Sequence, residues 1–248
     1  MTISLQDKTI LVTREPQTAQ HFANQISAYG GRAVITPLLR IQCLPYSLKD
    51  KTNVSEHFDW IFFTSKNGVN CFMKQRANLN GCKIAAVGPK TAIAVEKFGY
   101  GVDFIPTTYN AEVMAAEFLD TYKHSGLVLF VRGKLASPIL LNAFTRAQRP
   151  YTCVEVYDTT INIAEKAHLC SSVREEAIDF ITFTSPSTVD AFMQLTSEEN
   201  QKDIPAVCIG TTTEKRALEV GFAQTIVPRT FTIEGMLEAI HKEIERRQ

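Results

Sequence analysis

The sequence predicts an α/β protein of two lobes, each with a parallel sheet, and three observations lead to that prediction. Short, continuous apolar segments alternate with helical segments of about ten residues, which is typical of parallel strands covered on both faces. The chain contains two versions of one unit, about 120 residues apart. Two extended segments, 37–45 and 151–159, interrupt the alternation.

The repeat is clearest in a strand that runs into a hydroxyl-rich turn. Residues 59–65 read DWIFFTS, and residues 179–185 read DFITFTS. A weaker sequence match links ILVTR at 10–14 with VLFVR at 128–132. Further positions match along the chain: Val69 with Val189, Phe72 with Phe192, Met73 with Met193, Gly88 with Gly210, Thr91 with Thr213, Gly99 with Gly221, Pro106 with Pro228 and Met114 with Met236. We infer a duplicated unit.

The expected strands at 60–63 and 180–183 are short and apolar without polar alternation, which predicts burial on both faces. Further strands are expected at residues 10–14, 33–35, 128–132 and 153–156, and two more end just before Gly88 and Gly210.

The expected helices lie between these strands. Val69, Phe72 and Met73 are spaced i, i+3, i+4, which predicts a helix after the first matched strand, and the second copy keeps the spacing. Gly99 and Gly221 are typical of helix ends. The last helix, expected at about 235–247, buries three apolar residues and ends in two arginines: Met236, Ile240, Ile244, Arg246 and Arg247.

The two extended segments predict a pair of strands that connect the lobes. Each lies between two successive groups of alternating strands and helices. We therefore expect a discontinuous first lobe, 1–37 with 160–248, and an inserted second lobe, 42–151. Residues 37–45 and 151–159 are the expected connecting strands.

Composition argues against nucleic-acid and membrane partners. Lys and Arg together number 26, as do Asp and Glu, so no net field attracts nucleic acid or acidic membranes. An anionic ligand would need local donors. The N-terminus has no apolar signal-peptide core, and no uninterrupted apolar run approaches the ~18 residues of a membrane span. We expect a soluble, cytoplasmic monomer.

The cysteines and histidines show no metal-binding or redox spacing. There is no Cys-x-x-Cys and no His-x-x-x-His, so we expect neither a metal nor another cofactor. We expect free, mostly buried thiols in a reducing cytoplasm. The residues are Cys43, Cys71, Cys82, Cys153, Cys170 and Cys208, and His21, His57, His124, His168 and His241.

Four hydroxyl-rich loops follow predicted strands and open helices. Ligands collect at the carboxyl ends of parallel strands, where helix amides favour anions. Ser, Thr and Asn also start helices as caps alone, but four such loops at equivalent places favour binding. The candidate substrate-binding residues are Thr64, Ser65, Lys66, Asn67, Gly88, Lys90, Thr91, Thr184, Ser185, Pro186, Ser187, Gly210, Thr211, Thr212 and Thr213.

Arginines at matched strand ends add candidate donors. Arg14 and Arg132 are either packed surface residues or carboxylate ligands, and the residues leave both interpretations open. Gly133 and Lys134 extend the second cluster. No nucleotide-binding glycine motif and no Gly-x-Ser-x-Gly elbow is present. The chemistry would therefore depend on positioning and hydrogen-bond donors.

Together these motifs resemble the uroporphyrinogen-III synthase family. The resemblance is carried by Thr-Arg at 13–14, Phe-Thr-Ser in both copies, Gly-x-x-Thr at 88–91 and 210–213, and Val-Tyr-x-Thr at 156–159. It extends from about residue 8 to residue 240. It implies two flavodoxin-like lobes, a two-stranded linker, and an active site in the cleft between the lobes.

The resemblance implies a cofactor-independent cyclising dehydration in haem or sirohaem biosynthesis. Hydroxymethylbilane, which carries eight carboxylates, would lose its terminal hydroxyl and close to uroporphyrinogen III through a spiro intermediate that inverts ring D. Tyr157 matches the family tyrosine that helps the hydroxyl leave as water. Transient contact with hydroxymethylbilane synthase is a further expectation. Lys66-Asn67 and Arg149-Pro150 depart from the usual pattern, which leaves side-chain roles in the first loop open.

Two other function classes stay open from the residues alone. One is a non-catalytic two-lobed module that binds an anion or sugar, and the other is a two-lobed glycosyltransferase. No export signal, output domain or diphosphate-binding Arg/Lys–Glu set supports either of them.

Overall fold

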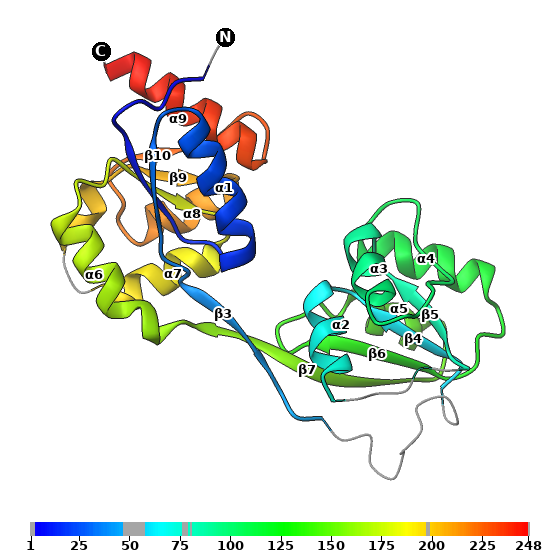
Figure 1. The fold of residues 1–248 in the computed structure, drawn as a ribbon. Helices are drawn as coiled ribbons and strands as arrows, with labels where there is room; N and C mark the ends of the chain where they lie inside the picture. Colours follow the sequence, from blue (N-terminus) through cyan, green and yellow to red (C-terminus); the bar gives the residue numbers. More distant parts are fainter. Residues whose placement is uncertain (1–2, 47–57, 76–78, 80, 197–198, 248) are drawn as a thin grey trace. The chain divides into compact units, whose positions relative to one another are not determined.

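The structure is a computed structural model that describes residues 3–46, 58–75, 79, 81–196 and 199–247. His57 lies outside the described residues. The chain divides into two compact units, unit 1 from Met1–Arg40 with Thr160–Gln248 and unit 2 from Ile41–Thr159 (Figure 1).

Unit 1 contains a five-stranded sheet in the order β10-β9-β8-β1-β2. All neighbouring strands in it are parallel. In chain order this arrangement is 2-1-3-4-5, a doubly wound order of the flavodoxin-like type. The strands are β1 (Thr9–Val12), β2 (Arg32–Ile35), β8 (Phe180–Phe183), β9 (Ala206–Cys208) and β10 (Thr225–Ile226). The predicted parallel α/β fold is confirmed.

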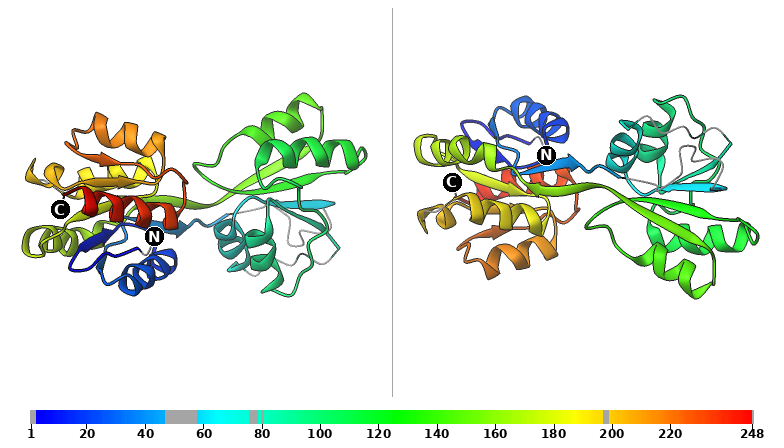
Figure 2. Two further views of the ribbon diagram at one scale, coloured as in Figure 1. Left: turned by 90° about the horizontal axis from the view of Figure 1, so that it is seen from above. Right: turned by 90° about the horizontal axis from the view of Figure 1, so that it is seen from below.

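Helices cover both faces of this sheet, as Figure 2 shows. Successive strand residues point to opposite faces, so Ile10 and Leu11 belong to different core clusters. Helices α1 and α9 cover one face, and α6, α7 and α8 cover the other. The helices are α1 (Pro16–Ala28), α6 (Lys166–Glu175), α7 (Pro186–Leu195), α8 (Thr211–Glu219) and α9 (Ile233–Arg247), with short 3₁₀ turns η2 (Ile163–Glu165) and η3 (Glu199–Asp203).

Unit 2 has a five-stranded sheet in the order β3-β7-β6-β4-β5. Strands β4, β5, β6 and β7 pair in parallel, and Phe104 adds a parallel bridge to Ala85. Under the repeat, β7-β6-β4-β5 corresponds to β2-β1-β8-β9, so both units share one strand order. The strands are β3 (Leu39–Cys43), β4 (Trp60–Phe63), β5 (Lys83–Ala86), β6 (Val128–Gly133) and β7 (Tyr151–Ile161).

The helices of unit 2 are α2 (Lys66–Met73), α3 (Pro89–Glu96), α4 (Ala111–Thr121) and α5 (Ile139–Arg146). Helices α2 and α3 pack on one sheet face, and α4 and α5 on the other. Aromatic rings fill the core between the sheet and helices α4 and α5. There the rings of Trp60 and Phe62 each pack edge to face on Phe118, with ring centroids 4.8 and 4.6 Å apart. No described helix is both long and apolar enough to cross a membrane.

Two glycines end helices as predicted. Gly99 has φ +85° after α3, and Gly221 has φ +96° after α8. Both lie in the left-handed region, which glycine enters without the steric cost of a Cβ atom. The matching backbone at both positions supports the duplication.

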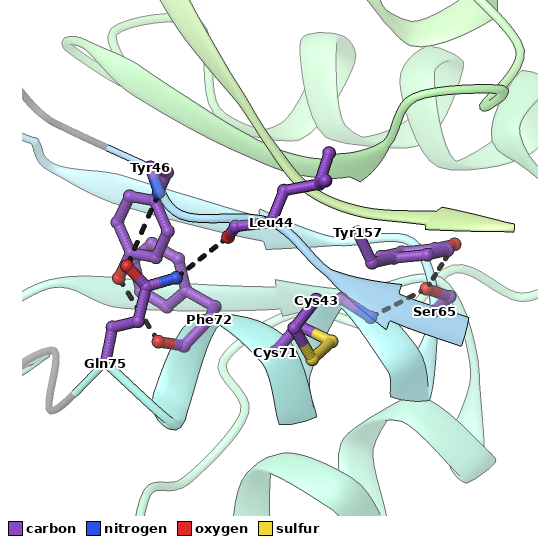
Figure 3. Close-up of a disulfide and its surroundings, with 9 residues drawn as sticks. Cys43, Leu44, Tyr46, Ser65, Cys71, Phe72, Gln75 and Tyr157 are labelled. Atoms are coloured by element: carbon purple, nitrogen blue, oxygen red, sulfur yellow. Dashed lines mark hydrogen bonds between the residues drawn. A yellow bond between two sulfur atoms is a disulfide. The ribbon is translucent and has the colours of Figure 1, made fainter. Parts of the chain in front are cut away.

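The prediction of six free, mostly buried thiols is wrong. The structure pairs Cys43 with Cys71 in a disulfide, with Cα atoms 5.2 Å apart (Figure 3), and Cys153 is exposed. Strand β3 pairs with β7, as shown by the hydrogen bond from the Leu44 amide to the Val156 carbonyl at 2.8 Å, and this places Cys43 against α2. That long-range pairing leaves no local sequence signal.

Candidate functional site

The carboxyl ends of β4, β6 and β7 lie at one edge of the unit 2 sheet because these strands are parallel. There the Tyr157 hydroxyl lies 3.0 Å from Oγ of Ser65 (Figure 3). Ser65 is the N-cap of α2, and its Oγ accepts a hydrogen bond from the Gly68 amide at 3.0 Å. One serine therefore connects the tyrosine hydroxyl to the positive end of a helix.

A β-bulge in β7 determines where Tyr157 lies. Arg132 is opposite Glu155, but the next residue, Gly133, is opposite Tyr157, so Val156 is the extra residue, and it is buried. Such a bulge bends the strand and re-aims a side chain. A Cβ atom at position 133 would lie 2.5 Å from Cζ of Tyr157, so only a glycine at this position gives the tyrosine ring enough space.

Arg132 and Lys134 flank this glycine and are engaged within unit 2. Nε of Arg132 donates to the glycine carbonyl at 3.3 Å, and its Nη2 donates to the carbonyl of Ala136. The Lys134 amide donates to the Tyr157 carbonyl at 2.9 Å, and its Nζ is 3.6 Å from Oδ2 of Asp158. Arg132 thus shapes its own loop with some of its five N–H groups. Its contact with a substrate carboxylate stays a prediction.

The loop after β5 begins α3 at Gly88. This residue is buried and extended, and its carbonyl accepts a hydrogen bond from the Thr91 amide at 3.0 Å. The Thr91 side chain is buried, so it supports the turn, whereas Lys90 is exposed and can reach a ligand. In the loop after β4, the candidates Thr64, Lys66 and Asn67 are half-buried.

In unit 1 the hydroxyls at the start of α7 serve as caps. Oγ of Ser185 accepts from the Thr188 amide at 3.3 Å, and Oγ1 of Thr188 accepts from the Ser185 amide at 3.3 Å. The Ser185 and Ser187 hydroxyls lie 2.9 Å apart. This geometry supports the capping interpretation for Ser185. The neighbouring Thr184 is half-buried and Pro186 is exposed.

The start of α8 offers exposed hydroxyls instead. Gly210 is the N-cap, and the helix has no side-chain cap there. Thr211 and Thr212 are exposed, but Thr213 is 1% exposed, and its amide donates to the Gly210 carbonyl at 3.1 Å. Of the three predicted threonines, only the first two can meet a ligand with their side chains.

Arg14 lies just beyond the carboxyl end of β1, next to β8 in the sheet. Burial lowers the pKa of its guanidinium, and the Glu15 carboxylate acts in the opposite direction. Arginine nevertheless stays charged. Its guanidinium makes no hydrogen bond to any residue within the described part of the chain. A half-buried cation of this kind is suited to a carboxylate ligand.

A family model for "Uroporphyrinogen-III synthase HemD" matches residues 20–238. A uroporphyrinogen-III synthase from Chlorobaculum parvum is 29% identical over 96% of this chain and 100% of its own length. A putative one from Methanocaldococcus jannaschii is 30% identical over 96% and 99%. The chain belongs to the uroporphyrinogen-III synthase family. That membership confirms the predicted resemblance and enzyme class.

Solved structures of uroporphyrinogen-III synthases share the fold. The one from Helicobacter pylori has a TM-score of 0.66 at 18% identity and covers 95% of this chain and 99% of its own. A mutant from Thermus thermophilus has a TM-score of 0.58 at 14% identity, with 96% and 99% covered.

In this member of the uroporphyrinogen-III synthase family, three residues beside the candidate loops of the two units were not predicted. Asp158 pairs with Lys134, and two exposed rings, Tyr109 and Phe231, pack on Gly88 and Gly210. Extending the repeat to Tyr109 and Phe231 would have found the rings, because both follow their glycines at the same spacing. Among the described residues, no group of three or more His, Cys, Asp or Glu side chains is placed to hold a metal ion.

Proposed function

We propose that this chain converts hydroxymethylbilane to uroporphyrinogen III by a cyclising dehydration that inverts ring D through a spiro intermediate. Membership of the family supports the reaction. The observation that supports the residue roles is the Tyr157–Ser65 pair at the start of α2, held at the edge where parallel strands end.

Tyr157 is the proposed acid for loss of the terminal hydroxyl. Its O–H donates a proton to the leaving oxygen, the carbon–oxygen bond breaks and water departs. The pyrrole nitrogen keeps its proton and supplies the electron pair that gives a protonated, cationic azafulvene. The Ser65 hydroxyl and the positive end of α2 stabilise the charge left on the tyrosine oxygen, the helix end by about 0.3–1 kcal/mol. A proton released during ring closure restores the tyrosine. Each step balances without a cofactor.

Loop ends in both units are proposed to hold the carboxylates. Lys90, Lys134 and Arg14 supply charge, and Thr211 and Thr212 supply exposed hydroxyls. The chain has a formal net charge of +0, so this attraction is local. Holding one conformer of a flexible polyanion favours the inverted product over the uninverted type I isomer. Thr91, Ser185 and Thr213 donate their amides within their own loops and Pro186 has no N–H, so these four residues are proposed to shape the loops. The remaining loop candidates are proposed to contribute main-chain amides: Thr64, Ser65, Lys66, Asn67, Gly88, Gly133, Thr184, Ser187 and Gly210.

Separation of the isomers formed from hydroxymethylbilane tests the activity, and Tyr157→Phe tests the mechanism. The unaltered chain should yield the type III isomer. In the Tyr157→Phe variant kcat should fall about 10-fold while Tm stays unchanged. The expected fall is modest because the hydroxyl leaves easily and needs less acid assistance than most leaving groups. Tyr151→Phe is a matched control, since this hydroxyl lies on the same strand and bonds Thr145 at 2.9 Å. Type I product alone would overturn the activity, and unchanged kcat would remove Tyr157 from the mechanism.

The setting is also proposed. We expect a cytoplasmic monomer that receives the bilane in transient contact with hydroxymethylbilane synthase, because the free bilane closes unaided to type I. The cleft between the lobes and the lobe boundaries expected from the sequence stay predictions.

A further inference from the structure

An exposed aromatic ring lies over the first glycine of a helix in each unit. A Cβ atom at Gly88 would lie 3.2 Å from Cγ of Tyr109, and one at Gly210 would lie 3.6 Å from Cγ of Phe231. The two glycines are the N-caps of α3 and α8, which follow matched strands. Each ring follows its glycine by the same number of residues, so the arrangement is duplicated.

Ordered turns present both rings. Tyr109 precedes Asn110, the N-cap of α4, whose Oδ1 accepts from the amide three residues later at 2.8 Å. Phe231 precedes Thr232, whose Oγ1 accepts from the amide three residues later at 3.1 Å. In both turns the amide of the capping residue donates to the carbonyl two residues earlier at 2.8 Å. The backbone therefore limits where each ring can lie.

Packing on the glycines leaves most of each ring exposed, and packing against the following helix does not account for the exposed part. An apolar residue before an N-cap often packs against the fourth helical residue as a hydrophobic staple. The corresponding residues, Met114 and Met236, are 0% exposed, yet Tyr109 is 62% and Phe231 58% exposed. Single exposed apolar residues are common. An exposed ring at the same place in both copies indicates a ligand for the open faces.

We infer that Tyr109 and Phe231 are positioning residues that each hold a pyrrole ring of the bilane, an inference that rests on the proposed function. A pyrrole is flat and carries an N–H, so it can stack on an aromatic face or donate to it. Its acid side chains then reach the loops already assigned to carboxylates. Held rings restrict rotation about the bridges of the bilane, which favours one mode of closure.

Truncation of the two rings tests this inference. Tyr109→Ala and Phe231→Ala should each raise KM for hydroxymethylbilane about 3- to 10-fold and lower the type III fraction, because a stacked ring contact is lost. Tyr109→Phe and Phe231→Tyr should restore both values. Tyr109→Leu and Phe231→Leu keep apolar contact with the glycines but lack the ring, so they should resemble the alanine variants in KM while keeping the wild-type Tm.

Two exposed apolar residues outside the proposed contacts are the controls. Phe98→Ala, in the turn after α3, and Leu218→Ala, on α8, remove comparable exposed groups and should leave KM unchanged. Wild-type KM and type III fraction in both folded leucine variants would overturn the inference. If the unaltered chain forms no type III isomer, the proposed function fails instead, so the two failures are distinguishable.

Discussion

The starts of α2 and α7 share one motif but use it differently. Both follow a Phe-Thr-Ser strand end, and in both the serine caps the helix. In unit 2 the Ser65 hydroxyl also meets Tyr157. In unit 1 the Ser185 hydroxyl instead meets Ser187, and Ser185 forms a capping box with Thr188. After β2 the only hydroxyl is that of Thr36, which is fully buried 3.5 Å from Nδ1 of His168, and the next two residues, Pro37 and Leu38, carry none. Duplication has kept the scaffold, and we expect proton transfer in one copy alone.

A second difference is the covalent link in unit 2. The Cys43–Cys71 disulfide ties β3 to the helix that Ser65 begins, and the described residues of unit 1 contain no such link. Around it, Tyr46 stacks on Phe72 at 4.8 Å, and Gln75 donates to the Leu44 carbonyl at 3.0 Å (Figure 3). The C-terminal end of α2 is therefore anchored by the end of β3 and the residues that follow it.

Breaking this link should have the largest effect. Closing a loop of sequence separation 28 stabilises a fold by about 3–4 kcal/mol in the chain-entropy description. Cys43→Ser or a reducing agent should therefore lower the unfolding midpoint of unit 2. Trp60, the chain's one tryptophan and buried in this unit, reports that transition by fluorescence.

Cys153→Ser is the matched control, because it removes an exposed free thiol from the same unit. Thiol titration of the non-reduced protein should count four groups. Six thiols together with a reductant-independent Trp60 midpoint would contradict the pairing, and would agree with the reducing cytoplasm expected from the sequence, where disulfides are rare.

The parallel α/β architecture could be predicted because its determinants are local. The apolar runs 60–63 and 180–183 are fully buried central strands, and the repeat correctly implied that both units share one topology. The positions of Gly99 and Gly221 follow from a backbone conformation that few other residues tolerate.

The details of the candidate site could not be predicted because they depend on long-range register. The bulge at Val156 decides that Tyr157 faces Gly133, and a one-residue change of pairing would reverse the side chain. No local signal marks it. The hydroxyl-rich loops were correctly placed at strand ends, but burial of Thr91 and Thr213 separates supporting residues from exposed ones only in three dimensions.

Adding one carbon beside the tyrosine should give the next largest effect. Gly133→Ala places a Cβ atom 2.5 Å from Cζ of Tyr157, so the ring or the strand must move. We expect kcat to fall about 10- to 100-fold, because a displacement of about 1 Å in a catalytic group can reduce the rate by this much. Gly101→Ala in the same unit is the control, since its Cβ would meet nothing within 4 Å. Equal effects of the two changes on kcat would show that the Tyr157 position is unimportant.

The matched serines sharpen the comparison with the smallest effects. Ser65→Ala and Ser185→Ala each remove a helix cap, so each should cost about 1 kcal/mol of stability. Only Ser65→Ala should also lower kcat, by about 3- to 10-fold, because it removes the hydrogen-bond partner of Tyr157. The double variant Ser65→Ala with Tyr157→Phe should lose little more kcat than Tyr157→Phe alone, because the effects of substitutions within one hydrogen-bonded pair are not additive. An equal fall in kcat for both serine variants would mean that helix capping alone matters, and that the two starts are functionally alike.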